Sequence, residues 1–183
     1  MSKTVVLNFF GGPGTGKSTG AAYVFALLKM AGINAELVTE AAKDLTWEEA
    51  FKNLRDQPYV FGKQAHRLFR CADMVDIIVT DSPIFLSTIY NEDVNIDAEL
   101  NNLIIKVMNK YDNINIMLHR VKPYNPVGRS QTESESDDIA KDIIHCLDAA
   151  GLEYFNFDGD RNGYDAIFDL VMNKLKRSKT KDD

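Results

Sequence analysis

The chain is poor in cysteine and has no long apolar run. Its two cysteines, Cys71 and Cys146, lie far apart and in no CxxC spacing, which favours reduced thiols over a disulfide framework. No stretch approaches the roughly 18 apolar residues of a membrane helix, and the apolar part of the N-terminus is too short for a secretory signal. The three histidines have no cysteine or acidic partners at ligand spacing, so no zinc site is indicated. We therefore expect a cytoplasmic protein without membrane contact.

Positive charge is also in deficit. The 21 Lys and Arg residues stand against 27 Asp and Glu, which gives a formal net charge of −6 and a pI near 5.1. This balance argues against a protein that binds nucleic acid or an anionic membrane over its whole surface. It does not exclude a local basic cleft. With 45% hydrophobic residues in a chain of 183, the composition predicts one folded domain, residues 1–176, followed by a polar tail at 177–183.

Strand-like and helix-like segments alternate along the chain, which predicts an α/β fold with a parallel sheet. The expected strands are 4–10, 33–39, 74–80, 114–119 and 154–157. The expected helices are 17–31, 46–54, 59–72, 98–111, 137–149 and 164–175. Residues 123–136 contain two prolines, a glycine and many hydroxyl side chains, which predicts a loop inside the domain.

The segment between the first strand and the first helix matches a phosphate-binding loop. Residues 11–18 read GGPGTGKS and fit G-x-x-x-x-G-K-[ST] completely, in the strand–loop–helix context that this motif needs. Glycines let backbone N–H groups converge on phosphate oxygens, and the helix N-terminus adds positive potential there. We expect Lys17 to reach the β- and γ-phosphates of ATP and Ser18 to hold Mg²⁺. The residues expected to bind ATP are Gly12, Gly14, Thr15, Gly16, Lys17, Ser18 and Thr19.

Acidic residues follow two of the other predicted strands, and ligands of open α/β sheets bind beyond the carboxyl ends of the strands. Asp81 comes directly after an apolar run and suits a carboxylate that holds magnesium through water, although Asp81-Ser82-Pro83 also suits a turn or helix start. Because Ser82 stands where motor ATPases usually place a glutamate, the sequence favours transfer over hydrolysis. Glu40 is a candidate proton acceptor for the acceptor hydroxyl, or else a solvated carboxylate.

Cations gather in two further segments. Lys63, Arg67 and Arg70 share one predicted helix face next to Gln64, which suggests a substrate-binding surface, or simply a solvated helix face. Residues 120–136 have the prolines and glycine of a lid, and Arg120 and Arg129 are candidates to contact the transferring phosphoryl group. The alternative is an ordinary exposed loop.

Three further segments give weaker indications. The acidic run 133–138 is expected to cap the following helix and to pair with lid arginines. Residues 158–163 follow the last strand and are candidates to hold an adenine ring, or form a plain pair of turns. Trp47 is expected to pack in the core.

Together these segments resemble a known family. GGPGTGKST after the first strand, LVTEAAKDL at the second strand end, VTDSP at the third and HRVKPYNPVGRSQTESE at the lid look like the small P-loop, AAA-type ATPase/kinase domains of tailed bacteriophages. That group is similar to the ribosylnicotinamide kinase domain and, more distantly, to nucleoside and nucleotide kinases. The resemblance implies a three-layer P-loop NTPase fold, with a five-stranded parallel sheet flanked by helices and a lid loop at about 120–136.

The resemblance also implies an activity: transfer of the γ-phosphoryl group of MgATP to a hydroxyl of a nucleoside- or nucleotide-like substrate. Lys17, Glu40, Asp81, Arg120 and Arg129 are the expected catalytic residues, with Ser18 and Asp81 at the metal. The expected substrate contacts are Glu40, Gln64, Arg67 and Arg70. Asp81-Ser82-Pro83 departs from the Asp-Arg-[Ser/Tyr] of many nucleoside kinases, which leaves the acceptor open. The alternatives are a phage DNA kinase acting on a hydroxymethyl pyrimidine, which binds DNA as its substrate, and an ATPase or switch with no phosphoryl acceptor.

Overall fold

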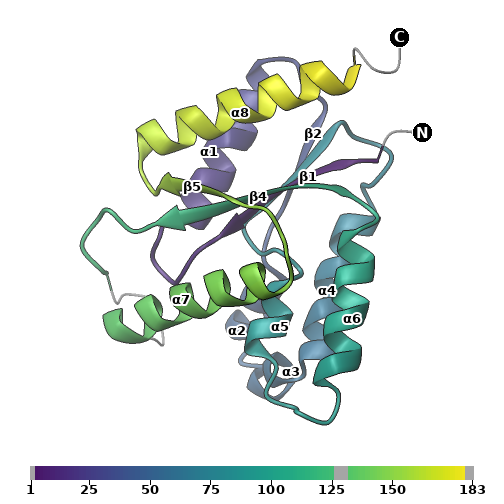
Figure 1. The fold of residues 1–183 in the computed structure, drawn as a ribbon, viewed down its shortest axis with the longest axis vertical. Helices are drawn as coiled ribbons and strands as arrows, with labels where there is room; N and C mark the ends of the chain where they lie inside the picture. Colours follow the sequence, from purple (N-terminus) through teal and green to yellow (C-terminus); the bar gives the residue numbers. More distant parts are fainter. Residues whose placement is uncertain (1–2, 126–131, 180–183) are drawn as a thin grey trace.

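The computed structural model describes residues 3–125 and 132–179. Five strands form one parallel sheet in the order β2-β3-β1-β4-β5 (Figure 1). Their bounds are β1 Val5–Phe10, β2 Ala35–Val38, β3 Ile77–Thr80, β4 Asp112–His119 and β5 Phe155–Asp158. The α/β fold with a five-stranded parallel sheet is therefore confirmed. Because β1 is the central strand, the loop that follows it leaves the sheet at its middle.

Helices cover both faces of the sheet (Figure 1). On one face lie α1 (Lys17–Met30) and α8 (Arg161–Lys179), and on the other lie α4 (Gln57–Phe69), α6 (Asp97–Met108) and α7 (Glu133–Ala149). Three short helices, α2 (Ala41–Trp47), α3 (Phe51–Arg55) and α5 (Leu86–Tyr90), gather beside the far ends of α4 and α6. None of the helices in the described ranges is long and apolar enough to cross a membrane.

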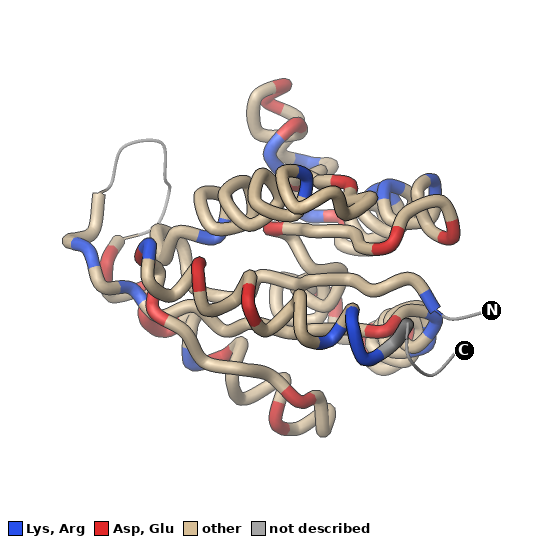
Figure 2. Tube along the Cα trace, turned by 90° about the horizontal axis from the view of Figure 1, so that it is seen from above, with Lys and Arg blue, Asp and Glu red and all other residues tan. Residues whose placement is uncertain are grey.

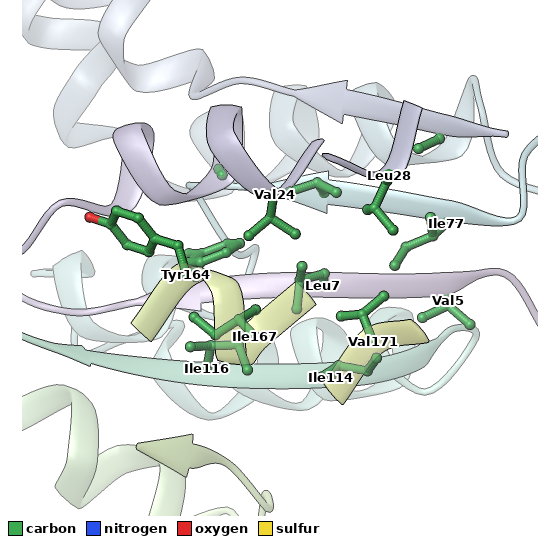
Figure 3. Packing of buried hydrophobic residues seen from close by; sticks show 14 of the residues in the cluster. Val5, Leu7, Val24, Leu28, Ile77, Ile114, Ile116, Tyr164, Ile167 and Val171 are labelled. Carbon is green, nitrogen blue, oxygen red and sulfur yellow. The ribbon is translucent and has the colours of Figure 1, made fainter. Parts of the chain in front are cut away.

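Two apolar cores hold these layers together, one on each face of β1. Because strand side chains alternate between faces, Val5, Leu7 and Phe9 point to one core while Val6 and Phe10 point to the other. The first core joins the sheet to α1 and α8 (Figure 3), through fully buried side chains that include Val24, Leu28, Ile167 and Val171. The second joins it to α4, α6 and α7 through Leu68, Ile104 and Ile143.

The structure corrects the predicted helix at 46–54. Two short helices, α2 and α3, occupy this region, and α2 begins directly after Glu40. Thr46 lies inside α2, where its hydroxyl donates to the carbonyl oxygen of Ala42 at 3.0 Å. Trp47 is 78% exposed, so the prediction that it packs in the core is wrong. The pattern around a single aromatic residue does not show whether its side chain faces the core or the solvent.

The last third of the chain is more helical than expected. Helix α7 begins at Glu133, because Thr132 and Glu135 form a capping box in which each side chain binds the backbone N–H of the other. The end of the predicted loop 123–136 is therefore the first turn of this helix. Helix α8 continues to Lys179, into the segment predicted as a tail. Helix α5 begins shortly after Asp81-Ser82-Pro83, which fits the alternative that these residues lead into a helix, although its own five residues are too few to show a helical period.

Candidate functional site

The loop between β1 and α1 has the curled backbone that a phosphate-binding loop needs. Gly14 (φ +82°) and Gly16 (φ +94°) lie in the left-handed region, which favours glycine because it has no Cβ. The ammonium group of Lys17 donates to the carbonyl oxygens of Gly11 at 2.7 Å and Gly12 at 3.1 Å. The side chain that would meet the phosphates is thus already folded back over the loop.

Two of the remaining residues, Ser18 and Thr19, are exposed to solvent, whereas Thr15 is buried beneath the loop. Ser18 and Thr19 are exposed in the first turn of α1, which carries no acidic residue and no side-chain cap. Unpaired N–H groups at such a helix start attract anions. Thr15 is buried, and its hydroxyl donates to the carbonyl oxygen of Gly12 at 2.9 Å, so this side chain supports the loop from inside.

Asp81 follows β3, the strand beside β1, and one of its carboxylate oxygens is buried. This atom, Oδ1, has no hydrogen-bond partner among residues 3–125 and 132–179. A buried carboxylate oxygen without a donor is costly, and it fits a site whose cation or water is still to bind. The hydroxyl of Ser18 and the carboxylate of Asp81 are both oxygen donors of the kind that Mg²⁺ prefers. The chemistry of these two residues therefore fits a magnesium site.

Glu40 ends the segment after β2 and is electrostatically coupled to the same site. Burial raises the pKa of its carboxyl group above the ordinary value, while nearby Lys17 opposes the rise and nearby Asp81 adds to it. Glu40, Lys17 and Asp81 are thus close enough to interact electrostatically, although they follow three different strands. The carboxyl ends of β1, β2 and β3 thus supply one cation and two acids to a shared site.

Tyr90, at the end of α5, also lies beside Glu40. Burial raises the pKa of its phenol, and the Glu40 carboxylate raises it further. Sequence reasoning missed Tyr90, because no motif contains it and the five-residue helix that carries it is too short to show a helical period. Its position beside Glu40 follows from the placement of α5 after β3.

Gln64 and Arg67 on α4 are held by the backbone around Glu40. The side chain of Gln64 is 3% exposed; its Oε1 accepts from the N–H of Ala41 at 2.9 Å, and its Nε2 donates to the carbonyl oxygen of Thr39 at 3.4 Å. The guanidinium of Arg67 donates to the same carbonyl oxygen at 3.0 Å and pairs with Asp44. Both side chains thus support the Glu40 segment, and most of their polar atoms are already bonded to the protein.

Arg70, the fourth expected substrate contact, is not brought together with Glu40, Gln64 and Arg67 in the described part of the chain. Helix α4 runs antiparallel to the strands, so its last turn reaches the amino end of β3 rather than the carboxyl end. Arg70 accordingly lies beside Cys71 and Glu36, and the neighbouring Asp73 binds Thr4 at the start of β1. The spacing that placed Arg70 on one helix face with Arg67 did not show which of the two reaches the Thr39 backbone.

Arg120 follows β4 and is fixed against the first turns of α7. Its guanidinium pairs with Glu133 at 3.3 Å and with Asp137, and stacks 5.1 Å from the ring centre of Tyr124. Its Nη1 is buried, with no hydrogen-bond partner in the described part of the chain. The expected pairing of the acidic run with a lid arginine is therefore confirmed for Arg120. Arg129 lies outside the described residues.

The segment after β5 packs against the phosphate loop. The N–H of Gly159 donates to the carbonyl oxygen of His119 at 2.8 Å, and a Cβ at Gly159 would approach the carbonyl oxygen of Thr15 to 2.0 Å. The hydroxyl of Tyr164 donates to the carbonyl oxygen of Gly16 at 3.1 Å. Residues 158–164 are thus a structural support of the loop, whatever else they bind.

Solved structures share this fold. The chain is similar to deoxyadenosine kinase from M. mycoides with bound dATP, with a TM-score of 0.56 and 18% identity over 93% of this chain and 99% of that chain. The same enzyme with the products dCMP and a flexible dCDP gives a TM-score of 0.52 and 22% identity over 94% and 99%. Shikimate kinase from Bacteroides thetaiotaomicron gives 0.48 and 12% over 94% and 98%.

The chain was also compared with curated proteins and with models of protein families. No curated protein matches it. A family described as AAA domain matches residues 6–162, which span the phosphate loop, Glu40, Asp81 and Arg120. The match covers most of the chain, and the phosphate loop with its flanking strand and helix lies inside it. The chain belongs to this AAA domain family.

Proposed function

We propose that the protein is an ATP-dependent kinase that transfers the γ-phosphoryl group of MgATP to a hydroxyl of a nucleoside- or nucleotide-like substrate. One observation carries the proposal: a phosphate loop with a lysine, a strand-end carboxylate with one unpartnered oxygen and a second, half-buried carboxyl group meet at the carboxyl ends of the strands. The fold shared with deoxyadenosine kinase supports a small acceptor of this class.

The loop side of the site holds the nucleotide. Lys17 exchanges the carbonyl oxygens of Gly11 and Gly12 for β- and γ-phosphate oxygens, and the backbone N–H groups of the loop bind the remaining ones. Ser18 and Asp81 would hold Mg²⁺, which neutralises charge on the phosphates when it is bound. Arg120 and Arg129 are proposed to face the transferring group from the lid side.

The Glu40 side of the site handles the acceptor. The acceptor oxygen bonds to the γ-phosphorus while the bond from that phosphorus to the β–γ bridging oxygen breaks, so that ADP leaves. The hydroxyl proton passes to the carboxylate of Glu40. A raised pKa makes this carboxylate a stronger base than a solvated one. Tyr90 stands beside Glu40 as a further wall of the acceptor site.

The charge distribution gives no support to a DNA acceptor. A DNA strand needs a continuous basic groove, but the guanidinium groups of Arg67 and Arg120 are paired with carboxylates. Figure 2 shows basic and acidic positions interspersed over the described chain. We therefore put forward the small-molecule acceptor alone.

Labelled transfer tests the proposal. The protein is incubated with Mg²⁺, ATP labelled at the γ-phosphate and a panel of nucleosides, nucleotides, and oligonucleotides with and without hydroxymethyl pyrimidines. Label on a nucleoside or nucleotide supports the proposal. Label on an oligonucleotide alone would establish the DNA reaction instead. Label found only in free phosphate across the whole panel would replace the kinase by an ATPase or switch.

A further inference from the structure

Two hydroxyl groups from outside the phosphate loop bind its backbone carbonyls. Ser136 in the first turns of α7 donates from Oγ to the carbonyl oxygen of Pro13 at 2.7 Å. Tyr164 in α8 donates from its phenol to the carbonyl oxygen of Gly16 at 3.1 Å. The two helices lie on opposite faces of the sheet, so the loop is held from both sides (Figure 1).

The surroundings of both hydroxyl groups are tightly packed. Ser136 is 2% exposed, and a Cβ at Gly12 would lie 2.3 Å from its carbonyl oxygen, so the α7 backbone touches the loop directly. A Cβ at Gly16 would lie 2.3 Å from the Tyr164 hydroxyl oxygen. Tyr164 also closes one end of the apolar core (Figure 3), with the rest of its side chain packed among buried residues. Neither hydroxyl can move far without moving the loop.

By holding these two carbonyl groups, the contacts also orient the N–H groups of the same peptide units. In a planar trans peptide the C=O and the following N–H point in opposite directions. When Ser136 holds the carbonyl of Pro13 toward α7, the N–H of Gly14 points away from α7. When Tyr164 and the helical N–H of Gly20 hold the carbonyl of Gly16, the N–H of Lys17 points out of the start of α1.

We infer that Ser136 and Tyr164 are positioning residues that hold the phosphate loop in its anion-binding conformation before the nucleotide arrives. The inference rests on the proposed function only in so far as the ligand is a nucleoside triphosphate. Preorganised donors lose less entropy on binding than donors that must first be ordered. Ser136 and Tyr164 act on the nucleotide through the backbone and do not touch it.

Matched pairs of variants test the inference. Ser136→Ala removes one loop contact, and Ser134→Ala changes an exposed serine in the same helical turn. Tyr164→Phe removes the other, and Tyr23→Phe removes a different phenol contact between α1 and α8, from Tyr23 to Asp165 at 2.8 Å. The dissociation constant for ATP is measured by calorimetry well below the melting temperature, and Tm is measured with and without ATP.

Ser136→Ala and Tyr164→Phe should each weaken ATP binding about fivefold, the usual effect of one hydrogen bond. The double variant should weaken it by about twentyfold. Both controls should keep the wild-type affinity, although Tyr23→Phe lowers Tm. The rise in Tm caused by ATP should shrink only in the Ser136 and Tyr164 variants, since that rise follows from affinity.

The opposite result is equally clear. If Tyr164→Phe and Ser136→Ala lower Tm but bind ATP like the wild type, the residues are purely structural and the inference is wrong. A wild-type chain that binds ATP but phosphorylates no acceptor overturns the proposed kinase while leaving this inference intact. A wild-type chain that binds no ATP overturns both.

Discussion

Gln64 binds the backbone on both sides of Glu40 through the two ends of one amide group. Its oxygen accepts from the N–H of Ala41 at 2.9 Å, and its nitrogen lies 3.4 Å from the carbonyl oxygen of Thr39. The amide thereby fixes the peptide units that flank the proposed proton acceptor. A residue expected from the sequence to bind substrate instead sets the position of Glu40.

Gln64→Leu should slow the reaction by displacing Glu40. The variant leaves buried backbone groups without partners, so the free energy of unfolding should fall by about 2 kcal/mol. Because Glu40 loses its support, kcat should fall about tenfold, a drop of the size expected when a catalytic group is misplaced. Gln57→Leu is the control, since Gln57 is a buried glutamine of the same helix that binds Leu54 instead. Equal kcat values in the two variants would remove Gln64 from this role.

Lys17→Ala should abolish tight ATP binding while the fold is retained. The ammonium group donates to the loop carbonyl oxygens of Gly11 and Gly12 and lies outside the two apolar cores, so its removal costs little packing. We expect an affinity loss of at least about 100-fold, consistent with a lost charge-assisted contact to phosphates. Calorimetric titration measures the affinity, and circular dichroism checks the fold. Lys29→Ala, at the other end of α1, should bind ATP normally.

Glu40→Gln should lose activity yet gain stability at neutral pH. Because burial raises the pKa of Glu40 in the folded state, folding favours the protonated form, and that stabilisation is lost as the pH rises through the folded-state pKa. A neutral glutamine avoids this loss. The variant should therefore unfold at higher denaturant than the wild type at pH 7, with the difference disappearing below about pH 4.5, the ordinary value. In the wild type the activity should rise with pH through the same ionisation. A wild-type level of transfer in the variant would dismiss Glu40 as the base.

Arg120→Ala should loosen the start of α7. It removes the contacts with Glu133 and Asp137 and the stacking on Tyr124. Both carboxylates are more than half exposed, so solvent screening limits the loss to about 1 kcal/mol, or roughly 3 °C in Tm. Raising the salt concentration should reduce the difference between variant and wild type. Lys141→Ala removes an exposed pair with Asp138 on the same helix and should leave Tm unchanged.

Local patterns predicted the strands and the loop well. Buried β-branched runs define β1, β3 and β4, and the glycines of residues 11–16 have the backbone angles that the motif requires. The capping box at Thr132 was readable in the sequence as Thr-x-x-Glu, but the nearby prolines favoured a loop instead.

Three-dimensional neighbours could not be derived in the same way. The direction of α4 separates Arg67 from Arg70, and nothing in their spacing reports that direction. The contacts of Ser136 with Pro13 and of Tyr164 with Gly16 join residues more than 120 positions apart. Such contacts depend on the order of the strands and on the face of the sheet that each helix covers. The pattern within a single segment does not show either of these.

The strand order β2-β3-β1-β4-β5 also sorts the chain into two halves about its central strand. Residues that surround Glu40 come from the β2 and β3 side, between the phosphate loop and β4 in sequence, whereas Ser136 and Tyr164 come from the β4 and β5 side. The contiguous stretch 39–90 therefore carries Glu40 together with the residues that surround it. The contacts of Ser136 and Tyr164 with the phosphate loop lie outside this stretch, so the segment around Glu40 and the support of the loop come from separate parts of the chain.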